Sequence, residues 1–171
     1  MKEESENCLP TLLIILDTGI LGLLTNPKCS KAQLRCKNWF RKITENKQIE
    51  ITTSEICDYE LRRELIRCKK HEGLKRLNEF RDTFGCLEVT RDVLDKAAQL
   101  WAWARETNQA TAHDESIDAD VILSAQSIIL SSEYNKSSII ATTNTKHLDR
   151  YTPSLHWEEA TIENCIKRCQ K

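Results

Sequence analysis

The sequence predicts an α/β fold, a single domain with a central, mostly parallel β-sheet of about four to five strands flanked by helices. The first observation is the run at residues 12–16, where five consecutive aliphatic residues are followed by Asp17. Such a run is typical of a strand buried on both faces in the middle of a parallel sheet. Strand-like and helix-like segments also alternate along the chain, as in sheets wrapped by helices. The length, 171 residues, suits one domain with a sizeable core.

Apolar periodicity and capping residues give the order of the elements. Ser30 and Asp92 each stand where a helix cap is expected, Thr52 and Glu55 have capping-box spacing, and Gly85 interrupts a helical pattern. Strands are expected at about 11–17, 49–52, 86–90, 139–141 and 155–157. Helices are expected at about 31–46, 54–70, 72–82, 92–107, 118–132 and 158–169. Loops are expected at about 108–117 and 144–153, and a flexible lead-in at about 1–10.

The composition excludes several classes of protein. The net charge is −1, so no overall field attracts nucleic acid, and a polyanion needs a local basic patch or a metal ion. The eight cysteines show no C-x-x-C spacing, and residues 2–6 are acidic rather than typical of a signal peptide. We therefore expect reduced thiols and a cytoplasmic protein. No apolar run is long enough to span a membrane, so no membrane partner is expected.

Acidic residues stand at strand ends and helix starts, where an open parallel sheet places its ligand site. They are Asp17, Glu55 or Glu60, Asp118 and Asp120. Two carboxylates about 4 Å apart repel by about 4 kcal/mol at an effective dielectric constant near 20. A fold gathers several of them when a hard cation such as Mg²⁺ or Mn²⁺ compensates their charge. Each acid also has a plain structural interpretation, as a strand end, a helix cap or a solvent-exposed helix residue.

Four motifs in order resemble the PIN-domain nuclease family, whose best-known members are VapC-type toxins. They are Ile-Leu-Asp-Thr-Gly-Ile-Leu at 15–21, Asp-Tyr-Glu-Leu-Arg-Arg-Glu-Leu at 58–65, Asp-Ala-Asp-Val-Ile-Leu-Ser-Ala-Gln at 118–126 and Ala-Thr-Thr-Asn-Thr-Lys-His-Leu at 141–148. Each motif alone has low specificity, whereas four in the family's order are fairly specific. The chain is similar to a PIN-like subgroup common in bacteria, cyanobacteria included.

The resemblance implies a PIN-like domain over residues 11–171 that hydrolyses RNA phosphodiester bonds with Mg²⁺ or Mn²⁺. It further implies a toxin of a toxin–antitoxin pair, with a cognate antitoxin and a homodimer as plausible partners. The family's three metal-binding acids correspond to Asp17, Glu60 and Asp120, and a frequent auxiliary acid corresponds to Asp118. The family's polar motif, which orients a metal-bound water or ligand, corresponds to Thr142 and Asn144. A basic surface that begins at Arg62, Arg63 and Arg67 is expected to bind RNA phosphates, or else to be a solvated, salt-bridged helix face.

Two positions depart from the family's pattern. Gly19 stands where Asn is usual, and His147 stands where many members have Asp, with Asp149 as a possible substitute. These departures leave the three main acids intact but open the question of metal affinity and rate. Glu55 competes with Glu60 for the second acid, and the motif favours Glu60.

Three other functions remain open. The first alternative is a catalytically weak or inactive PIN-like interaction module, against which stand the three surviving acids. Asp17-Thr18-Gly19 also matches the active-site tripeptide of aspartic proteases, but that fold is all-β and needs two copies. Another metal-dependent phosphohydrolase is disfavoured because the first strand lacks Asp-x-Asp.

Overall fold

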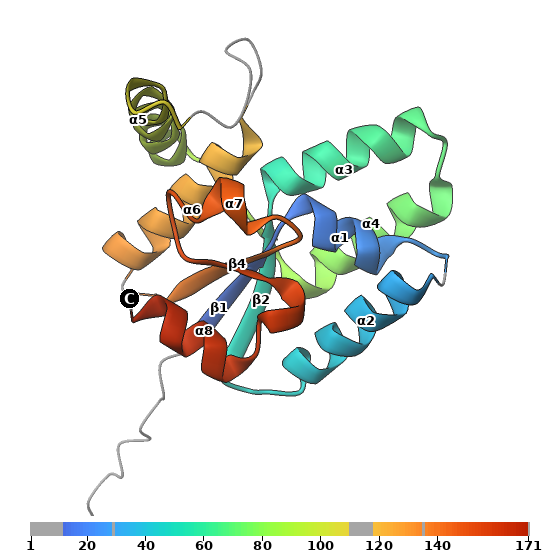
Figure 1. The fold of residues 1–171 in the computed structure, drawn as a ribbon. Helices are drawn as coiled ribbons and strands as arrows, with labels where there is room; N and C mark the ends of the chain where they lie inside the picture. The colour runs from blue at the N-terminus through green and yellow to red at the C-terminus, as the bar shows by residue number, and fades with distance from the viewer. Residues whose placement is uncertain (1–11, 29, 110–117, 135, 171) are drawn as a thin grey trace, which may run out of the picture.

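The computed structural model of the protein describes residues 12–28, 30–109, 118–134 and 136–170, and it centres on one parallel sheet (Figure 1). The strand order is β3-β2-β1-β4-β5, so the apolar first strand lies in the middle as predicted. The strands are β1 (Leu12–Leu16), β2 (Ile49–Ser54), β3 (Cys86–Leu87), β4 (Ser138–Thr142) and β5 (Ser154–His156). Every pairing is parallel, and Leu16 is in register with Thr53 on one side and Ala141 on the other. The predicted fold class is confirmed.

Helices flank this sheet, with α2 and α4 against β2 and with α6 and α8 against β4. The helices are α1 (Thr18–Thr25), α2 (Lys31–Thr44), α3 (Glu55–Arg67), α4 (His71–Phe84), α5 (Arg91–Glu106), α6 (Ala119–Glu133), α7 (Thr145–Leu148) and α8 (Ile162–Cys169), with a 3₁₀ turn η1 (Trp157–Glu159). Helix α5 packs on α6 and lies at the outer side of the molecule (Figure 1). Among the described helices, none is long and apolar enough to cross a membrane.

The core forms where the central strands meet the helices. Ile14, Ile15 and Leu16 are fully buried, as are Ile139 and Ile140 of the neighbouring strand. Burying side chains of this size contributes about 1.5–3 kcal/mol each, which explains why the central strands are almost wholly aliphatic. A cluster of aromatic rings covers the side of the core near α2 and α4, and it contains Trp39, Phe40, Phe80, Phe84 and Trp157. A second, smaller apolar cluster joins α5 to α6.

Several local predictions were wrong, and in each case a side-chain hydrogen bond or a tertiary contact explains the difference. Ser54, rather than Thr52 and Glu55, caps α3 by accepting from the backbone N–H of Ile56. Thr90, rather than Asp92, caps α5. The short helices α1 and α7 lie in segments where no helix was expected, and both begin directly after strands of the central sheet.

The remaining differences concern element lengths. The strand expected at 86–90 contains only Cys86–Leu87, because the backbone N–H of Val89 bonds instead to the Glu55 carboxylate, at 2.9 Å. The helix expected at 158–169 is divided into η1 and α8. The expected lead-in 1–10 and residues 110–117 of the expected loop lie outside the described residues. Among the cysteines that the structure describes, all are free thiols, as expected.

Candidate active site

Asp17 lies at the carboxyl end of the central strand, where it caps α1. Both of its carboxylate oxygens are held. Oδ1 accepts from the backbone N–H of Thr18 at 2.6 Å, and Oδ2 accepts from the Thr142 hydroxyl at 2.6 Å. Thr142 is the last residue of β4, and its hydroxyl also accepts from the backbone N–H of Asn144 at 3.0 Å. The ends of β1 and β4 are therefore joined through one half-buried carboxylate.

Glu60 reaches the same place from α3. Its Oε2 accepts from the hydroxyl of Thr18 at 2.7 Å, so Thr18 connects Glu60 to Asp17 through its two donors. The side chain of Glu60 remains 29% exposed, which leaves its carboxylate open to solvent on one side. Glu55, the competing acid, is engaged elsewhere by the backbone N–H of Val89. The structure thus joins Glu60, and not Glu55, to Asp17.

The other two predicted acids come from the start of α6. Asp118 is buried and caps the helix by accepting from the backbone N–H of Val121 at 3.3 Å. Asp120 lies in the first turn, and its Oδ2 is 3.2 Å from Nδ1 of His147, which α7 supplies. A cap and a first-turn residue can point toward the same side of a helix start, and the charges of Asp17 and Asp118 both act on Asp120.

Burial and neighbouring carboxylates raise the pKa of Asp120 and of Asp17. Burial raises the pKa of Asp120 to about 6, and the charges of Asp17 and then Asp118 act in the same direction. Burial also raises the pKa of Asp17, with a further contribution from the charge of Glu60. The hydrogen bonds from Thr142 and Thr18 oppose this effect on Asp17, and His147 lowers the pKa of both Asp17 and Asp120. The site therefore concentrates negative charge that its neighbours compensate only in part.

The donor set fits a hard divalent cation, since such ions prefer carboxylate oxygens and cancel their mutual repulsion. In the observed side-chain conformations, no three acidic, histidine or cysteine residues among those described are close enough together to coordinate one metal ion. Their outer oxygens instead contact Thr18, Thr142 and His147. Asn144 contributes a backbone N–H, and its side chain makes no capping bond to α7.

The three predicted RNA-binding arginines each have an acidic neighbour. Arg62 forms a bidentate salt bridge with the buried Asp58, in which Nε and Nη2 donate to the two carboxylate oxygens at 2.7 and 3.0 Å. Its Nη2 also donates to the side-chain oxygen of Asn78. Arg63 lies 3.9 Å from Glu60, and Arg67 pairs with Glu64. Arg62 therefore fastens α3 to α4.

Three residues that the sequence prediction did not single out lie at or beside this site. Thr18 connects Asp17 and Glu60, and Asp58 holds Arg62 in place. The sequence does contain a signal for each of them. Thr18 directly follows the acid at the end of the first strand, and Asp58 stands four residues before Arg62 on the same helix. Cys57 is a third such residue, because its thiol is buried beside Thr18, and burial followed by the charge of Asp17 raises its pKa.

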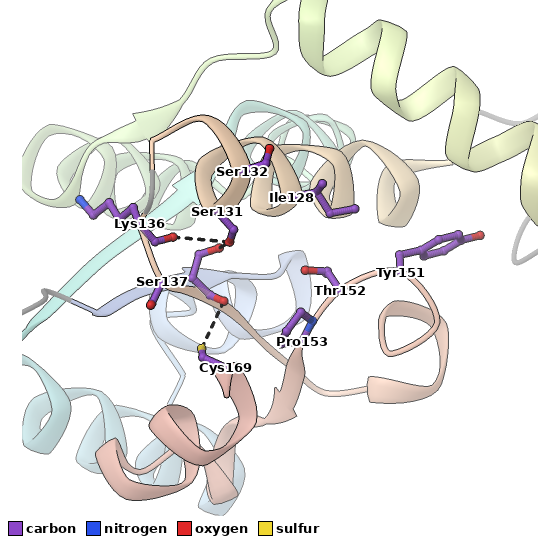
Figure 2. A pocket seen from close by; sticks show the side chains of 10 residues that line it. Ile128, Ser131, Ser132, Lys136, Ser137, Tyr151, Thr152, Pro153 and Cys169 are labelled. Carbon is purple, nitrogen blue, oxygen red and sulfur yellow. Dashed lines mark hydrogen bonds between the residues drawn. The ribbon is translucent and has the colours of Figure 1, made fainter. Parts of the chain in front are cut away.

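A cavity of about 410 Å³ lies at the opposite end of β4, where its lining residues include Ser131, Ser138 and Cys169 (Figure 2). Its hydroxyl groups bond mainly to one another: Ser127 lies 2.9 Å from Ser138 and 3.0 Å from Thr152, and Ser131 lies 3.3 Å from Ser138. The thiol of Cys169 donates to the carbonyl of Ser138. These hydroxyl groups bond to one another beside the cavity, which shares no lining residue with the acidic site.

Replacing Thr142 by Val is expected to destabilise the protein by about 1 kcal/mol, because a buried hydroxyl with two partners is lost at constant shape. The backbone N–H of Asn144 and one oxygen of Asp17 then lack their partner. Urea unfolding followed by circular dichroism measures the change. An unchanged midpoint would mean that this hydroxyl does not hold the two strand ends together.

The chain is similar to known proteins in its structure. Neither a protein-family model nor a curated protein matches the chain. Solved structures do match it, and three of them each align over 85% of this chain and 98% of theirs. They are VapBC2 from Rickettsia felis bound to a promoter DNA fragment (TM-score 0.64, 16% identity), VapBC-1 from nontypeable Haemophilus influenzae (0.61, 12%) and FitAcB from Neisseria gonorrhoeae (0.56, 18%). The chain therefore has a VapC-like PIN-domain fold.

Proposed function

We propose that the chain is a divalent-metal-dependent endoribonuclease and that it acts in the cytoplasm as the toxin of a toxin–antitoxin pair. The observation that carries this proposal is the convergence of acids from three separate segments, the end of β1, the middle of α3 and the start of α6. Asp17 and Glu60 are linked through Thr18, and the charges of Asp17 and Asp118 act on Asp120. Acids grouped in this way suit the binding of a cation and of the phosphodiester that it would activate.

We assign Asp17, Glu60 and Asp120, with Asp118 as auxiliary, to the binding of Mg²⁺ or Mn²⁺. When bound, such an ion polarises the phosphodiester and lowers the pKa of the attacking water. The remaining roles belong to the protein. Thr142 fixes the orientation of Asp17, Thr18 fixes that of Glu60, and His147 contacts Asp120 from α7. Thr142 and the backbone of Asn144 form the turn that closes the site beside β4.

The proposed partners are RNA and a cognate antitoxin. The structural neighbours VapBC2 and VapBC-1 are described as VapBC proteins, and VapBC2 was crystallised with promoter DNA. Beside the acids, Arg63 and Arg67 have side chains that are 61% and 71% exposed, and we assign them to contacts with RNA phosphates. Arg62 has a structural role instead, because Asp58 and Asn78 occupy its guanidinium.

The test is RNA cleavage by the purified protein. We expect cleavage with Mn²⁺ or Mg²⁺, loss of cleavage in EDTA, and recovery when excess metal is returned. Cleavage that is unaffected by EDTA would contradict the metal assignment, and its complete absence with either metal would contradict the nuclease assignment.

A second candidate function, an inactive interaction module, is favoured by one observation. In the described part of the chain, the acids contact threonine and histidine side chains instead of forming a metal cage. Such a module would bind its antitoxin but would cleave no RNA with either metal. The cleavage assay therefore separates the two candidates.

A further inference from the structure

Helix α2 and its flanks carry a concentrated positive charge that the acidic site does not use. Residues 28–47 contain seven lysines and arginines and one acid, Glu45, although the whole chain has a net charge of −1. Helix α2 itself contains five basic residues and no acidic residue. The rest of the chain is accordingly negative, so this segment is the part of the molecule most suited to a polyanion.

The basic side chains lie on the outward side of α2, because its other side is fixed in the core. Cys36 and Ile43 are buried there, and Trp39 donates to the carbonyl of Ala160 at 3.1 Å. The outward residues Lys31, Arg35, Arg41 and Lys42 are all exposed, and we call these four the α2 basic face. Lys31, Arg35 and Lys42 are spaced by four, seven and eleven residues, which keeps them on one side of the helix, and Arg41 directly precedes Lys42.

The α2 basic face differs from the basic residues of α3 and α4 in its ion pairs. On α3 and α4 most cations have an acid within one turn, as in Arg62 with Asp58, Arg67 with Glu64, and Arg76 with Glu72. On α2, Arg35 lies 3.4 Å from Glu158. In the described residues, Lys31, Arg41 and Lys42 have no acid within ion-pair distance.

The position of α2 relative to Asp17 follows from α1. Asp17 caps α1, whose eight residues span about 12 Å, and α1 packs against α2 (Figure 1). The fourteen residues of α2 span about 21 Å. Phosphates follow one another at about 3.4 Å along the axis of a duplex and farther apart in an extended single strand, so a single strand of about ten nucleotides is long enough to span α1 and α2.

We propose that the α2 basic face binds the phosphate backbone of RNA several nucleotides away from the acids. This inference rests on the proposed function and extends it to the path of the substrate. An acidic protein is the less favoured occupant, because protein interfaces have an apolar centre. The α2 basic face has only Leu34 as an exposed large apolar neighbour on its helix, and its centre is occupied by Asn38.

The experiment compares two variants with equal charge change. The first is Lys31→Gln with Arg41→Gln and Lys42→Gln, which breaks no ion pair in the described part of the chain. The control is Arg91→Gln with Lys96→Gln and Lys167→Gln, on α5 and α8, where Arg91 and Lys167 pair with acids. Affinity for a single-stranded RNA of about ten nucleotides, enough to span α1 and α2, is measured in EDTA over a range of KCl.

We expect the α2 variant to bind this RNA at least about tenfold more weakly, with the slope of log affinity against log salt reduced by about 2, at ~0.7 per lost contact. The control should stay within about twofold of wild type. With Mn²⁺, the α2 variant should lose cleavage of the long RNA but keep cleavage of a dinucleotide, whose single phosphodiester lies at the acids and leaves no further phosphate for α2.

The outcomes separate this inference from the proposed function. If the wild type cleaves RNA and the α2 variant keeps its affinity and salt slope, the inference is wrong and the nuclease proposal stands. If the wild type cleaves nothing but binds RNA through α2, the inference stands and the nuclease proposal fails. If the variant unfolds, the milder pair Lys31→Gln and Lys42→Gln should still lower the salt slope by about 1.4, and an unchanged slope would refute the inference.

Discussion

Replacing Asp17 by Asn, Glu60 by Gln or Asp120 by Asn is expected to reduce RNA cleavage at least about 100-fold, which corresponds to about 2.7 kcal/mol of transition-state stabilisation. The amide side chains keep the size of the originals, and at positions 17 and 60 the remaining oxygen can still accept one hydrogen bond from Thr18, so most of the local structure is preserved. What they lose is the negative charge that holds a divalent cation. Initial rates with Mn²⁺ on one RNA, measured beside circular dichroism spectra, give the result.

Glu55 supplies the matched control, since it lies on the same helix as Glu60 and undergoes the same change to Gln. Its carboxylate accepts from the backbone N–H of Val89 and makes no contact with Thr18. Glu55→Gln should therefore keep most of the cleavage activity. Full activity in Glu60→Gln, or loss of activity in Glu55→Gln without unfolding, would reverse the choice of second acid.

The central part of the fold was predictable because its signals are local. Five aliphatic residues in a row specify a strand buried on both faces, and residues 12–16 occupy that place between β2 and β4. Ser30 caps α2 with a complete capping box, since the side chain of Gln33 returns the bond. Asp118 caps α6, which begins at the next residue, within one residue of the predicted start.

The remaining differences depend on partners that are distant in the sequence. Glu60 and Thr18 are 42 residues apart, and Thr142 and Asp17 are 125 apart. Periodicity cannot show which hydroxyl meets which carboxylate, because that depends on how the ends of β1 and β4 are brought together. The pairing of Glu55 with Val89 likewise replaces the local capping box that its spacing from Thr52 suggests.

In the absence of metal, the acidic site is expected to lower the free energy of unfolding of the protein. Replacing Asp120 by Asn should relieve part of this effect. Burial raises the pKa of Asp120 from its ordinary value of 3.8 to about 6, so the folded protein disfavours its charged form. A carboxyl group of this kind lowers stability above pH ~6, and the penalty disappears as the pH falls toward ~4 and the group becomes protonated. In EDTA at pH ~7, we expect Asp120→Asn to raise the free energy of unfolding by about 1–2 kcal/mol, after an allowance for the lost contact with His147.

Urea titrations at several pH values test this expectation, with Asp82→Asn as the control because Asp82 is exposed and has no ion pair in the described residues. The gain from Asp120→Asn should shrink to nearly zero by pH ~4, where the wild-type carboxyl is neutral in the folded state. Saturating Mn²⁺ should also reduce the gain, because a cation that binds the folded wild type stabilises it by mass action. A gain that is independent of both pH and metal would mean that packing, rather than repulsion among the acids, limits stability at this site.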